Sequence, residues 1–319
     1  MIQYRAFRNS DAPQLAEIWR SGPAYRGLAQ PMSVATLETY VFSKPYFHRE
    51  GLQVAEQEGR LLGFVHTGPG PAADFQGTDP RVGVVSMLLV HDRAQKDEIA
   101  AALLSAAEKQ LVAAGAEEIY AFGVGKINPF YLGLYGGSAS PGLLESGPPW
   151  IELFESRGYR PQWSVSVLQR DLAGFRPPVD RTQMQIRRTS MVFPVLDPPP
   201  RHWWAACTVG PFDQIRFDLI PRAGGDAIAR ATFWNMEPLA VSWGVHALGL
   251  VDLETTPDLR RHGLATYLIG EALRQLHGEG FTLIEAQIRE DDHAAQGLFH
   301  KLGFQQVDRG HVLKKTLVT

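Results

Sequence analysis

The sequence predicts an α+β protein built from two copies of one arrangement of strands and helices. Its 319 residues suggest two domains at roughly 150 residues each. The order strand, helical region, hairpin, strand, long helix, strand, short helix, strand occurs twice along the chain. Two matching segments, LFESRGY at 153–159 and LFHKLGF at 298–304, end the short helix of each copy. A glycine after a helix is by itself only a C-cap, so the shared element order favours duplication.

Composition and charge narrow the class of protein. Hydrophobic residues make up 45% and charged residues 20% of the chain, which is typical of a globular protein and argues against disorder or a fibre. The net charge is −3, with 16 Lys and Arg against 18 Asp and Glu in residues 1–176 and 15 against 16 in 177–319. Neither half therefore has the positive field that attracts nucleic acid or an anionic membrane.

Cysteine content and the N-terminal sequence bear on the compartment. Cys207 is the only cysteine, which excludes an intramolecular disulfide and a cysteine-rich zinc site, and we expect it to be a small buried hydrophobe. The first residues, MIQYRAFRNSDAPQ, lack the pattern of a secretory signal, and no run reaches about 18 apolar residues. We therefore expect a cytoplasmic protein with no membrane partner and no nucleic-acid partner.

Turn signals and hydrophobic periodicity define the elements of the first half. Asn9-Ser10-Asp11 offers helix caps, and Pro13 is tolerated in a first turn. The QEGR segment at 57–60 predicts a hairpin, and the apolar run at 82–90 fits a buried strand. The expected strands are 2–6, 52–56, 61–66, 82–90, 118–124 and 163–168, and the expected helices are 12–21, 34–42, 99–111 and 151–157.

A proline-rich linker, FRPPVD at 175–180, separates the halves, so we expect domains at 1–176 and 177–319. PRAGGD at 221–226 predicts a second hairpin, and the prolines at 198–200 predict a loop. Helices early in this half are less clear. The expected strands are 184–188, 214–220, 227–234, 247–254 and 283–288, the expected helices are 264–276 and 294–302, and 307–317 is mostly extended.

The segment LETTPDLRRHGLATYL, residues 253–268, joins a strand to a helix. The first amides of a helix have no partners, and the helix dipole favours an anion beside them. Gly263 has no side chain to block the approach of an anion, and Ala265 is nearly as permissive. Arg260 and Arg261 add positive charge. The segment therefore predicts a diphosphate-binding site.

Two motifs in this half resemble those of the GCN5-related N-acetyltransferase (GNAT) superfamily. Arg260-x-x-Gly263-x-Ala265 resembles the Arg/Gln-x-x-Gly-x-Gly/Ala acetyl-CoA loop of that family. The segment DHAAQGLFHKLGF at 292–304 resembles its Asn-x-x-Ala-x-x-Leu-Tyr-x-x-x-Gly-Phe helix. The motifs cover about residues 247–307, and the element order extends the resemblance more weakly over the rest. It implies an α/β-sandwich-like architecture of two tandem GNAT-type folds, each a mixed, twisted sheet flanked by helices.

The resemblance also implies an activity, an N-acetyltransferase with acetyl-CoA as acyl donor and no metal. Acetyl-CoA would enter a V-shaped gap between the strand that ends at Glu254 and the strand over 283–288. A small-molecule or peptide amine would attack the thioester directly, with no covalent enzyme intermediate; the acceptor could be a small amine, an amino sugar, an amino acid or a protein terminus. The implied acetyl-CoA-binding residues are Leu253, Thr255, Arg260, Arg261, His262, Gly263, Leu264, Ala265, Thr266, Asp292 and Phe299.

The sequence departs from the family pattern at the position of the general acid. Phe299 stands where the family has a tyrosine that protonates the thiolate, and Asp292 replaces an asparagine but can still cap the helix. Acid catalysis then comes from another group or from water, or a thiolate with a pKa near 8.5 needs little help, or the half binds CoA without turnover. The last reading gives the alternative function, a non-catalytic CoA- or ligand-binding regulatory protein of tandem GNAT fold.

The strand before the loop offers two candidate bases, Asp252 and Glu254. Strand alternation places both on one face, where burial could raise the pKa of either carboxyl. Either could instead face solvent or pair with Arg260 or Arg261. Three histidines lie near the motifs, but a surface or hydrogen-bonding role is more common for such residues: His246, His262 and His293.

The first half lacks an intact loop. VHDRAQKDEIA at 90–100 falls at the loop position, where Gln95 and Ala100 fit the pattern. Glu98 replaces the glycine and Asp97 adds a second carboxylate, so we expect poor CoA binding here. Phe154 takes the tyrosine position in this half too. This unequal pair resembles tandem GNAT proteins such as mycothiol synthase, in which the second repeat is the active one.

One first-half segment, residues 126–149, has no counterpart in the second half. It is long, aromatic and glycine-rich, and long ordered loops are often functional. It either lines a substrate cleft or covers the partner repeat, or it packs its aromatic residues on its own domain.

Overall fold

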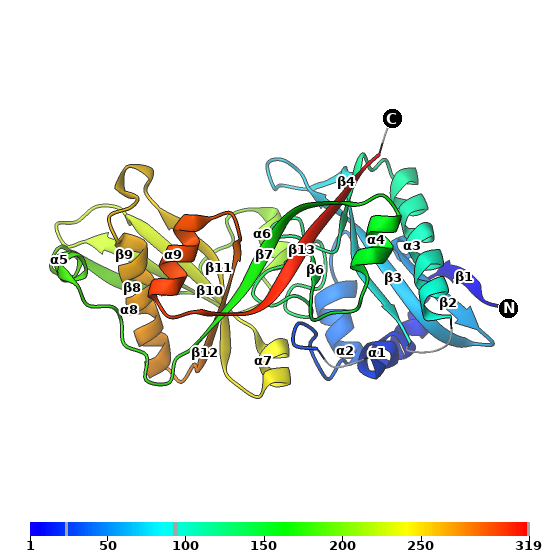
Figure 1. Cartoon of the computed structure of the whole chain (residues 1–319), viewed down its shortest axis with the longest axis horizontal. Helices are drawn as coiled ribbons and strands as arrows, with labels where there is room; N and C mark the ends of the chain where they lie inside the picture. Colours follow the sequence, from blue (N-terminus) through cyan, green and yellow to red (C-terminus); the bar gives the residue numbers. More distant parts are fainter. Residues whose placement is uncertain (23–24, 92–94, 318–319) are drawn as a thin grey trace.

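The computed structural model describes residues 1–22, 25–91 and 95–317. In this part of the chain a single thirteen-stranded sheet runs through both halves, in the order β1-β2-β3-β4-β5-β13-β7-β12-β11-β10-β9-β8, with β6 beside β13 (Figure 1). The strands are β1 (Gln3–Ala6), β2 (Leu52–Gln57), β3 (Arg60–Pro71), β4 (Thr78–Val90), β5 (Glu118–Ala121), β6 (Leu143–Leu144), β7 (Arg160–Asp171), β8 (Ser190–Leu196), β9 (Gln214–Pro221), β10 (Ala229–Asn235), β11 (Ala247–Thr255), β12 (Leu283–Arg289) and β13 (Gln305–Thr316).

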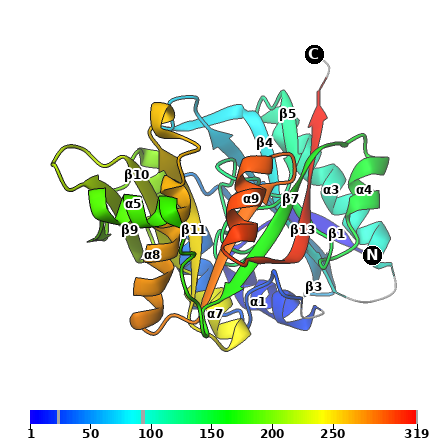
Figure 2. The same ribbon diagram turned by 60° about the vertical axis from the view of Figure 1, so that its left-hand side comes forward.

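Helices flank this sheet. Figure 2 shows α5 lying across α8, with α9 beside them on the same face of the second half. No helix among the described residues has the length and apolarity needed to cross a bilayer. The helices are α1 (Ala12–Ser21), α2 (Val34–Leu37), α3 (Lys96–Ala113), α4 (Ile151–Ser156), α5 (Arg181–Thr189), α6 (Trp203–Thr208), α7 (Glu237–Trp243), α8 (Leu264–Gly278) and α9 (His293–Lys301), with shorter helical turns at 9–11, 38–42, 49–51 and 257–259.

The two halves share one plan, as the sequence predicts. Each contains a parallel strand pair, β4 with β5 and β11 with β12, inside an otherwise antiparallel sheet. Each also has a one-residue bulge at the same place: Ser86 is skipped in the pairing of β3 with β4, and Val251 in the pairing of β10 with β11. The fold is thus a mixed sheet flanked by helices, built twice.

The last strand of each half belongs to the sheet of the other half. β7 closes the first half of the chain, but its residues from Val165 to Asp171 pair with β12. β13, at the other end of the chain, pairs with β5 as well as with β7. Figure 1 shows these two strands crossing side by side between the halves. The exchange makes one continuous sheet out of two repeats.

The prediction of a strand at 184–188 is wrong, because this stretch belongs to helix α5. Asp180 caps the helix by accepting a hydrogen bond from the Gln183 amide at 2.8 Å. Gln183 and Ile186 are buried three positions apart, which is helical spacing rather than strand alternation. Edge strand β8 follows directly. Helices α6 and α7 were not predicted, and His202 caps the first of them through its imidazole.

Two hydrophobic cores support the halves. The second core lies between strands β9 to β12 and helices α8 and α9. The first core fills the first half and also takes in Trp204, Phe212, Trp234 and Leu239 from the second. This shared packing fixes the two halves against each other, so that a site can be built where they meet.

Candidate active site

Strands β11 and β12 separate soon after they begin. They pair only from Ala247 with Leu283 to Gly249 with Glu285. Beyond these residues β12 continues beside β7, and β11 continues beside β10. Val251, in the bulge, has no partner on β10. The two strands therefore separate beyond Gly249 and Glu285, and this is the place where the family resemblance implies a gap.

The loop after β11 leads to a helix start that suits an anion. Gly263 is the N-cap of α8 with φ of +80°, a conformation that favours glycine. In the described part of the chain, the amides of Leu264, Ala265 and Thr266 donate to no protein group. Because these amides are unpaired and the dipole of a fifteen-residue helix lies behind them, an anion can bind there.

The side chains of this loop surround the helix start. Those of Arg260, Arg261 and His262 are exposed, and Arg260 Nε donates to the Thr255 carbonyl at 3.3 Å, which ties the loop to β11. A Cβ on Gly263 would lie 3.0 Å from Gln183 Nε2, so α5 already packs against one side of the glycine. The space left for an anion is therefore on the side away from α5.

Helix α9 carries the second motif. Asp292 Oδ1 accepts a hydrogen bond from the Ala295 amide at 3.0 Å, so the aspartate caps the helix as expected. Phe299 is 3% exposed and meets Phe304 edge to face, with ring centroids 4.9 Å apart. Its ring is a core residue with no proton to donate, so any acid must come from elsewhere.

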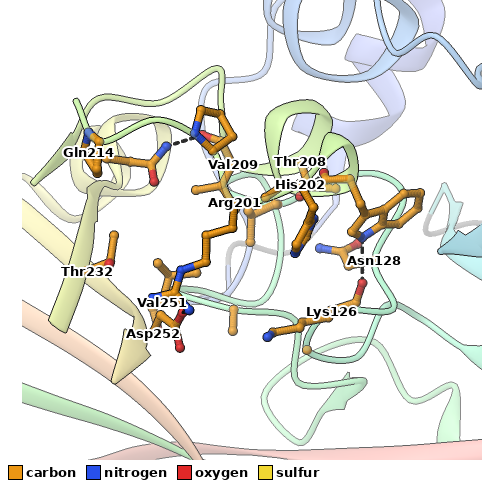
Figure 3. Close-up of a pocket in the computed structure, with 18 of the residues that line it drawn as sticks. Lys126, Asn128, Arg201, His202, Thr208, Val209, Gln214, Thr232, Val251 and Asp252 are labelled. Atoms are coloured by element: carbon orange, nitrogen blue, oxygen red, sulfur yellow. Dashed lines mark hydrogen bonds and ion pairs between the residues drawn. The ribbon is translucent and has the colours of Figure 1, made fainter. Parts of the chain in front are cut away.

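A cavity of about 340 Å³ lies where the two halves meet, a size that suits a small molecule. Figure 3 shows Arg201 reaching to Asp252 on β11, with Lys126 and His202 directed into the same space. The first half contributes residues of the 125–139 loop, and the second half contributes residues of 198–209 and of strands β9 to β12. Val251 and Asp252 line it, so the cavity reaches the gap beside β11.

Arg201 holds the two candidate bases. Its Nη1 lies 3.0 Å from Asp252 Oδ2 and also pairs with Glu254 Oε1. Both carboxylates thus share one face of β11, as the alternation predicts, but their partner is Arg201 and not Arg260 or Arg261. The hydrogen bond from Arg201 lowers the pKa of Glu254. Glu254 is therefore a carboxylate at neutral pH.

His202 presents a hydrogen-bond donor to the cavity. Its Nδ1 accepts from the Ala205 amide at 3.0 Å, so the hydrogen of the neutral ring is on Nε2. Burial, helped by the charges of Lys126 and Arg201, lowers the pKa of His202 and keeps the ring neutral. The three histidines near the motifs have exposed side chains outside the cavity lining: His246, His262 and His293.

The 126–149 loop packs aromatic residues on its own half and also lines the cavity. Phe130 and Tyr131 are buried in the core of its own half. Its Ser138 and Ala139 line the cavity, and Trp234 Nε1 donates to the Ser138 carbonyl at 2.9 Å. A Cβ on Gly249 would lie 2.7 Å from the Ser138 Cβ, so glycine is what lets the loop reach β11.

Two residues of β12 hold this loop in place. Gln287 Nε2 donates to the Gly136 carbonyl at 2.8 Å and to the Ala139 carbonyl at 3.1 Å. Glu285 is fully buried, and its Oε1 accepts from the Ser138 amide at 2.6 Å. Burial raises the pKa of Glu285, against the opposing effect of Arg26. The cavity wall is thus fixed from the strand that borders the gap.

Sequence reasoning missed Arg201, His202, Glu285 and Gln287. Arg201 and His202 directly follow the prolines at 198–200, and Glu285 is a charge within an apolar strand pattern. A charged residue inside a buried strand needs a polar partner. This requirement was the one signal in the sequence that pointed to Glu285.

The corresponding gap of the first half is filled. Trp150 Nε1 donates to the Leu88 carbonyl at 3.0 Å, and this side chain is 2% exposed. Leu88 lies two residues after the bulge at Ser86, as Leu253 lies two residues after the bulge at Val251. In the segment 90–100, residues 92–94 lie outside the described part, and Asp97 and Glu98 occupy the first turn of α3.

Comparison with known proteins agrees with the repeat. The model of the "Acetyltransferase (GNAT) family" matches twice, at residues 14–136 and 182–304. Among solved structures, a tandem GNAT protein from the clavulanic acid biosynthesis pathway aligns with a TM-score of 0.67 and 15% identity over 99% of this chain and 98% of that one. A GCN5-related N-acetyltransferase from Sphaerobacter thermophilus aligns with a TM-score of 0.61 and 15% identity over 99% and 95%.

A third structure holds the fold within a larger protein. A GCN5-related glucosamine N-acetyltransferase region of a fungal multi-domain β-N-acetylglucosaminidase aligns with a TM-score of 0.68 and 14% identity. The alignment covers 99% of this chain and 38% of that one, so the chain spans well under half of that protein. A search of curated proteins by sequence finds no match.

Proposed function

Because the chain belongs to the acetyltransferase (GNAT) family, we propose that its second half transfers an acetyl group from acetyl-CoA to an amine acceptor. One observation carries this proposal: Val251 and Asp252 belong both to the gap beside β11 and to the wall of the cavity between the halves. A donor in the gap and an acceptor in the cavity would therefore meet at these two residues.

The residues of this half have distinct tasks in the proposal. The unpaired amides of Leu264, Ala265 and Thr266 hold the pyrophosphate of acetyl-CoA, with Arg260 and Arg261 nearby. The backbone of β11 from Val251 to Thr255 lines the donor. Binding both reactants in fixed geometry then supplies much of the rate enhancement, because the attack becomes effectively unimolecular.

The attack itself forms a bond between the amine nitrogen and the acetyl carbon and breaks the bond from that carbon to sulfur. The proton of the amine passes to Asp252 or Glu254, directly or through water. Arg201 pairs with both groups, and its hydrogen bond lowers the pKa of Glu254, so that this carboxylate is ionised and can accept the proton. The departing thiolate needs little protonation near neutral pH, since thiols have a pKa near 8.5. This is compatible with Phe299 at the usual acid position.

The first half, in this proposal, binds no acetyl-CoA and serves as part of the acceptor site. Trp150 fills its gap, and Asp97 and Glu98 place negative charge at the helix start where a diphosphate would bind. Its 126–149 loop instead forms a wall of the cavity.

A second candidate function is binding of CoA or another ligand without turnover. It is favoured by the burial of Phe299 in the core and by the pairing of both candidate bases with Arg201. A protein of this kind would bind acetyl-CoA without consuming it.

The test combines binding with turnover. Calorimetry should detect acetyl-CoA binding, and chromatography should detect free CoA after a panel of amines is added. Gly263→Glu should abolish binding, because it puts a side chain and a negative charge at the helix start. The matched control is Gly278→Glu at the other end of α8, where a Cβ meets nothing within 4 Å.

Each outcome separates the candidates. Binding with CoA release supports the transferase, and binding without release on any amine supports the sensor. Intact binding in Gly263→Glu would contradict the donor site itself.

A further inference from the structure

Among the described residues, three cations and three carboxylates surround the cavity, and one of the cations, Lys126, forms none of their ion pairs. Arg216 donates to both carboxylate oxygens of Asp218, at 2.8 and 3.0 Å, and Arg201 is shared by Asp252 and Glu254. Lys126 forms no ion pair with any described residue. Its ammonium lies over the ring of Phe75, 5.9 Å from the centroid.

A hydrogen-bond donor lies beside this cation. The His202 ring stacks on the same Phe75 ring, with centroids 4.7 Å apart, so one aromatic side chain positions both groups. With Nδ1 occupied by the Ala205 amide, His202 directs its Nε2 hydrogen outward. Figure 3 shows both side chains directed into the cavity. An ammonium next to an N–H group is a site for an anion.

The remaining walls are largely apolar. Leu132, Trp204 and Val209 line the cavity together with the prolines at 198–200. The carboxylate of Asp252 lies at the side where the acetyl group would be presented. The cavity therefore has an anionic group at the reaction end, an apolar middle, and a cationic group from the other half of the chain.

We propose that the acceptor is an amine that also carries an anionic group, bound with its nitrogen toward Asp252 and its anion on Lys126 and His202. This inference rests on the proposed function, and it adds the substrate class. The first half of the chain then takes part in recognition, because Lys126 comes from its loop. A cavity of about 340 Å³ limits the acceptor to roughly the size of an amino acid or a short peptide.

The experiment compares amines that differ only in the remote group. A panel would contain an ω-amino acid, its carboxamide, the matching aminoalkyl phosphonate and the plain alkylamine. The acid should have a kcat/KM about 10- to 100-fold above that of its carboxamide, as expected for hydrogen bonds to a charged group. The phosphonate shows whether the site accepts anions generally or carboxylates alone.

Variants assign the preference to its residues. Lys126→Met should raise KM for the acid about tenfold or more, with kcat within about twofold and the carboxamide unaffected, and Lys126→Arg should restore the preference. His202→Asn keeps a capping oxygen for α6, but its shorter side chain no longer brings an N–H group to the position of the imidazole Nε2, so it should raise KM for the acid less.

Binding of the same amines in the presence of CoA gives a reading that needs no turnover. A preference for the acid in calorimetry supports the inference even if no amine releases CoA, a result that would defeat the proposed transferase alone. Equal affinity and equal kcat/KM for acid and carboxamide would overturn the inference while leaving the transferase standing. Absence of binding of any anionic amine would overturn it as well.

Discussion

The guanidinium of Arg26 lies 2.5 Å from the carboxylate of Glu285, and the two residues come from opposite halves of the chain. Arg26 also stacks over the Trp243 ring at 4.5 Å, and its carbonyl accepts from Trp243 Nε1 at 3.0 Å. Because the other oxygen of Glu285 holds the Ser138 amide, this pair connects the interface directly to the cavity wall.

Replacing the cation of this pair should destabilise the whole molecule. Arg26→Met leaves a fully buried carboxylate without its charge partner, so we expect the free energy of unfolding to fall by about 3–5 kcal/mol. Adding Glu285→Gln should recover part of this loss, because the neutral amide has no uncompensated charge. Urea denaturation measures both. The control is Arg274→Met, which breaks an exposed pair with Glu271 and should cost under about 1 kcal/mol. Equal losses in the two arginine variants would contradict the prediction.

The pH dependence of turnover should report on Arg201. This guanidinium lowers the pKa of Glu254, so its removal lets that pKa rise. If Asp252 or Glu254 accepts the proton, Arg201→Met should move the acidic limb of the kcat/KM profile to higher pH. The comparison is Arg216→Met, which removes a cation from the same cavity but one paired with Asp218. A limb that stays in place in Arg201→Met means that neither carboxylate governs it.

Stability should increase with pH because of Lys44. This buried side chain donates to the Cys207 carbonyl across the two halves, and burial lowers its pKa from the ordinary 10.5 to about 8. The unfolded chain therefore binds more protons than the folded one between these values, and the free energy of unfolding rises as pH increases through this window. The gain is up to about 3 kcal/mol, at 1.36 kcal/mol for each pH unit.

The measurement is chemical denaturation from pH 7 to 9.5. Tyrosines, with a pKa near 10, begin to ionise in the unfolded chain at the upper end of this range, and they do so equally in every variant compared. Lys44→Met should flatten the rise, whereas the exposed Lys109→Met should keep it. A slope shared by wild type and Lys44→Met would assign the effect to other groups.

Binding of acetyl-CoA should occur once per chain. Trp150→Phe removes the donor to the Leu88 carbonyl, so it should lower the free energy of unfolding by about 1–3 kcal/mol without opening a second site. The acidic first turn of α3 still repels a diphosphate in this variant. Calorimetry gives the stoichiometry. The control for the loss of ring size is Trp203→Phe, because the Trp203 indole donates no hydrogen bond to a described group. If either the wild type or Trp150→Phe binds two equivalents of acetyl-CoA, the proposal that the first half binds none is wrong.

Local signals made most of the fold predictable. The helix over 12–21 has its first-turn proline in the sequence, and the structure begins and ends it at the same residues. The expected cap is wrong, because residues 9–11 form a helical turn and the Asp11 carboxylate accepts from the Arg8 amide and not from an amide of the helix. The strand predicted at 184–188 is a helix in the structure. Its few apolar residues give no clear helical periodicity in the sequence, and the capping Asp180 lies within the proline-rich segment that predicts a linker. The exchange of β7 and β13 between the halves could not be predicted, because the sequence of a strand does not determine which neighbouring strand it pairs with.

The candidate site also has a part that local sequence predicts and a part that it does not. The loop at Gly263 and the cap at Asp292 are local motifs, so their geometry follows from sequence. The cavity is assembled from segments far apart in the chain, and the Arg201 pairing with Asp252 spans 51 positions. Only the three-dimensional arrangement brings such side chains together, and no spacing rule predicts it.

The exchange of β7 and β13 also bears on how the protein is made. Ala121 ends β5 and pairs with Leu313 of β13, which lies 192 positions later in the chain (313 less 121). At 5–20 residues per second, a ribosome needs roughly 10 to 40 s to synthesise that interval. During this time the first repeat has an open sheet edge at β5 and cannot reach its final pairing. The sheet of the first repeat is therefore completed only by a strand that follows the helices of the second repeat in the chain.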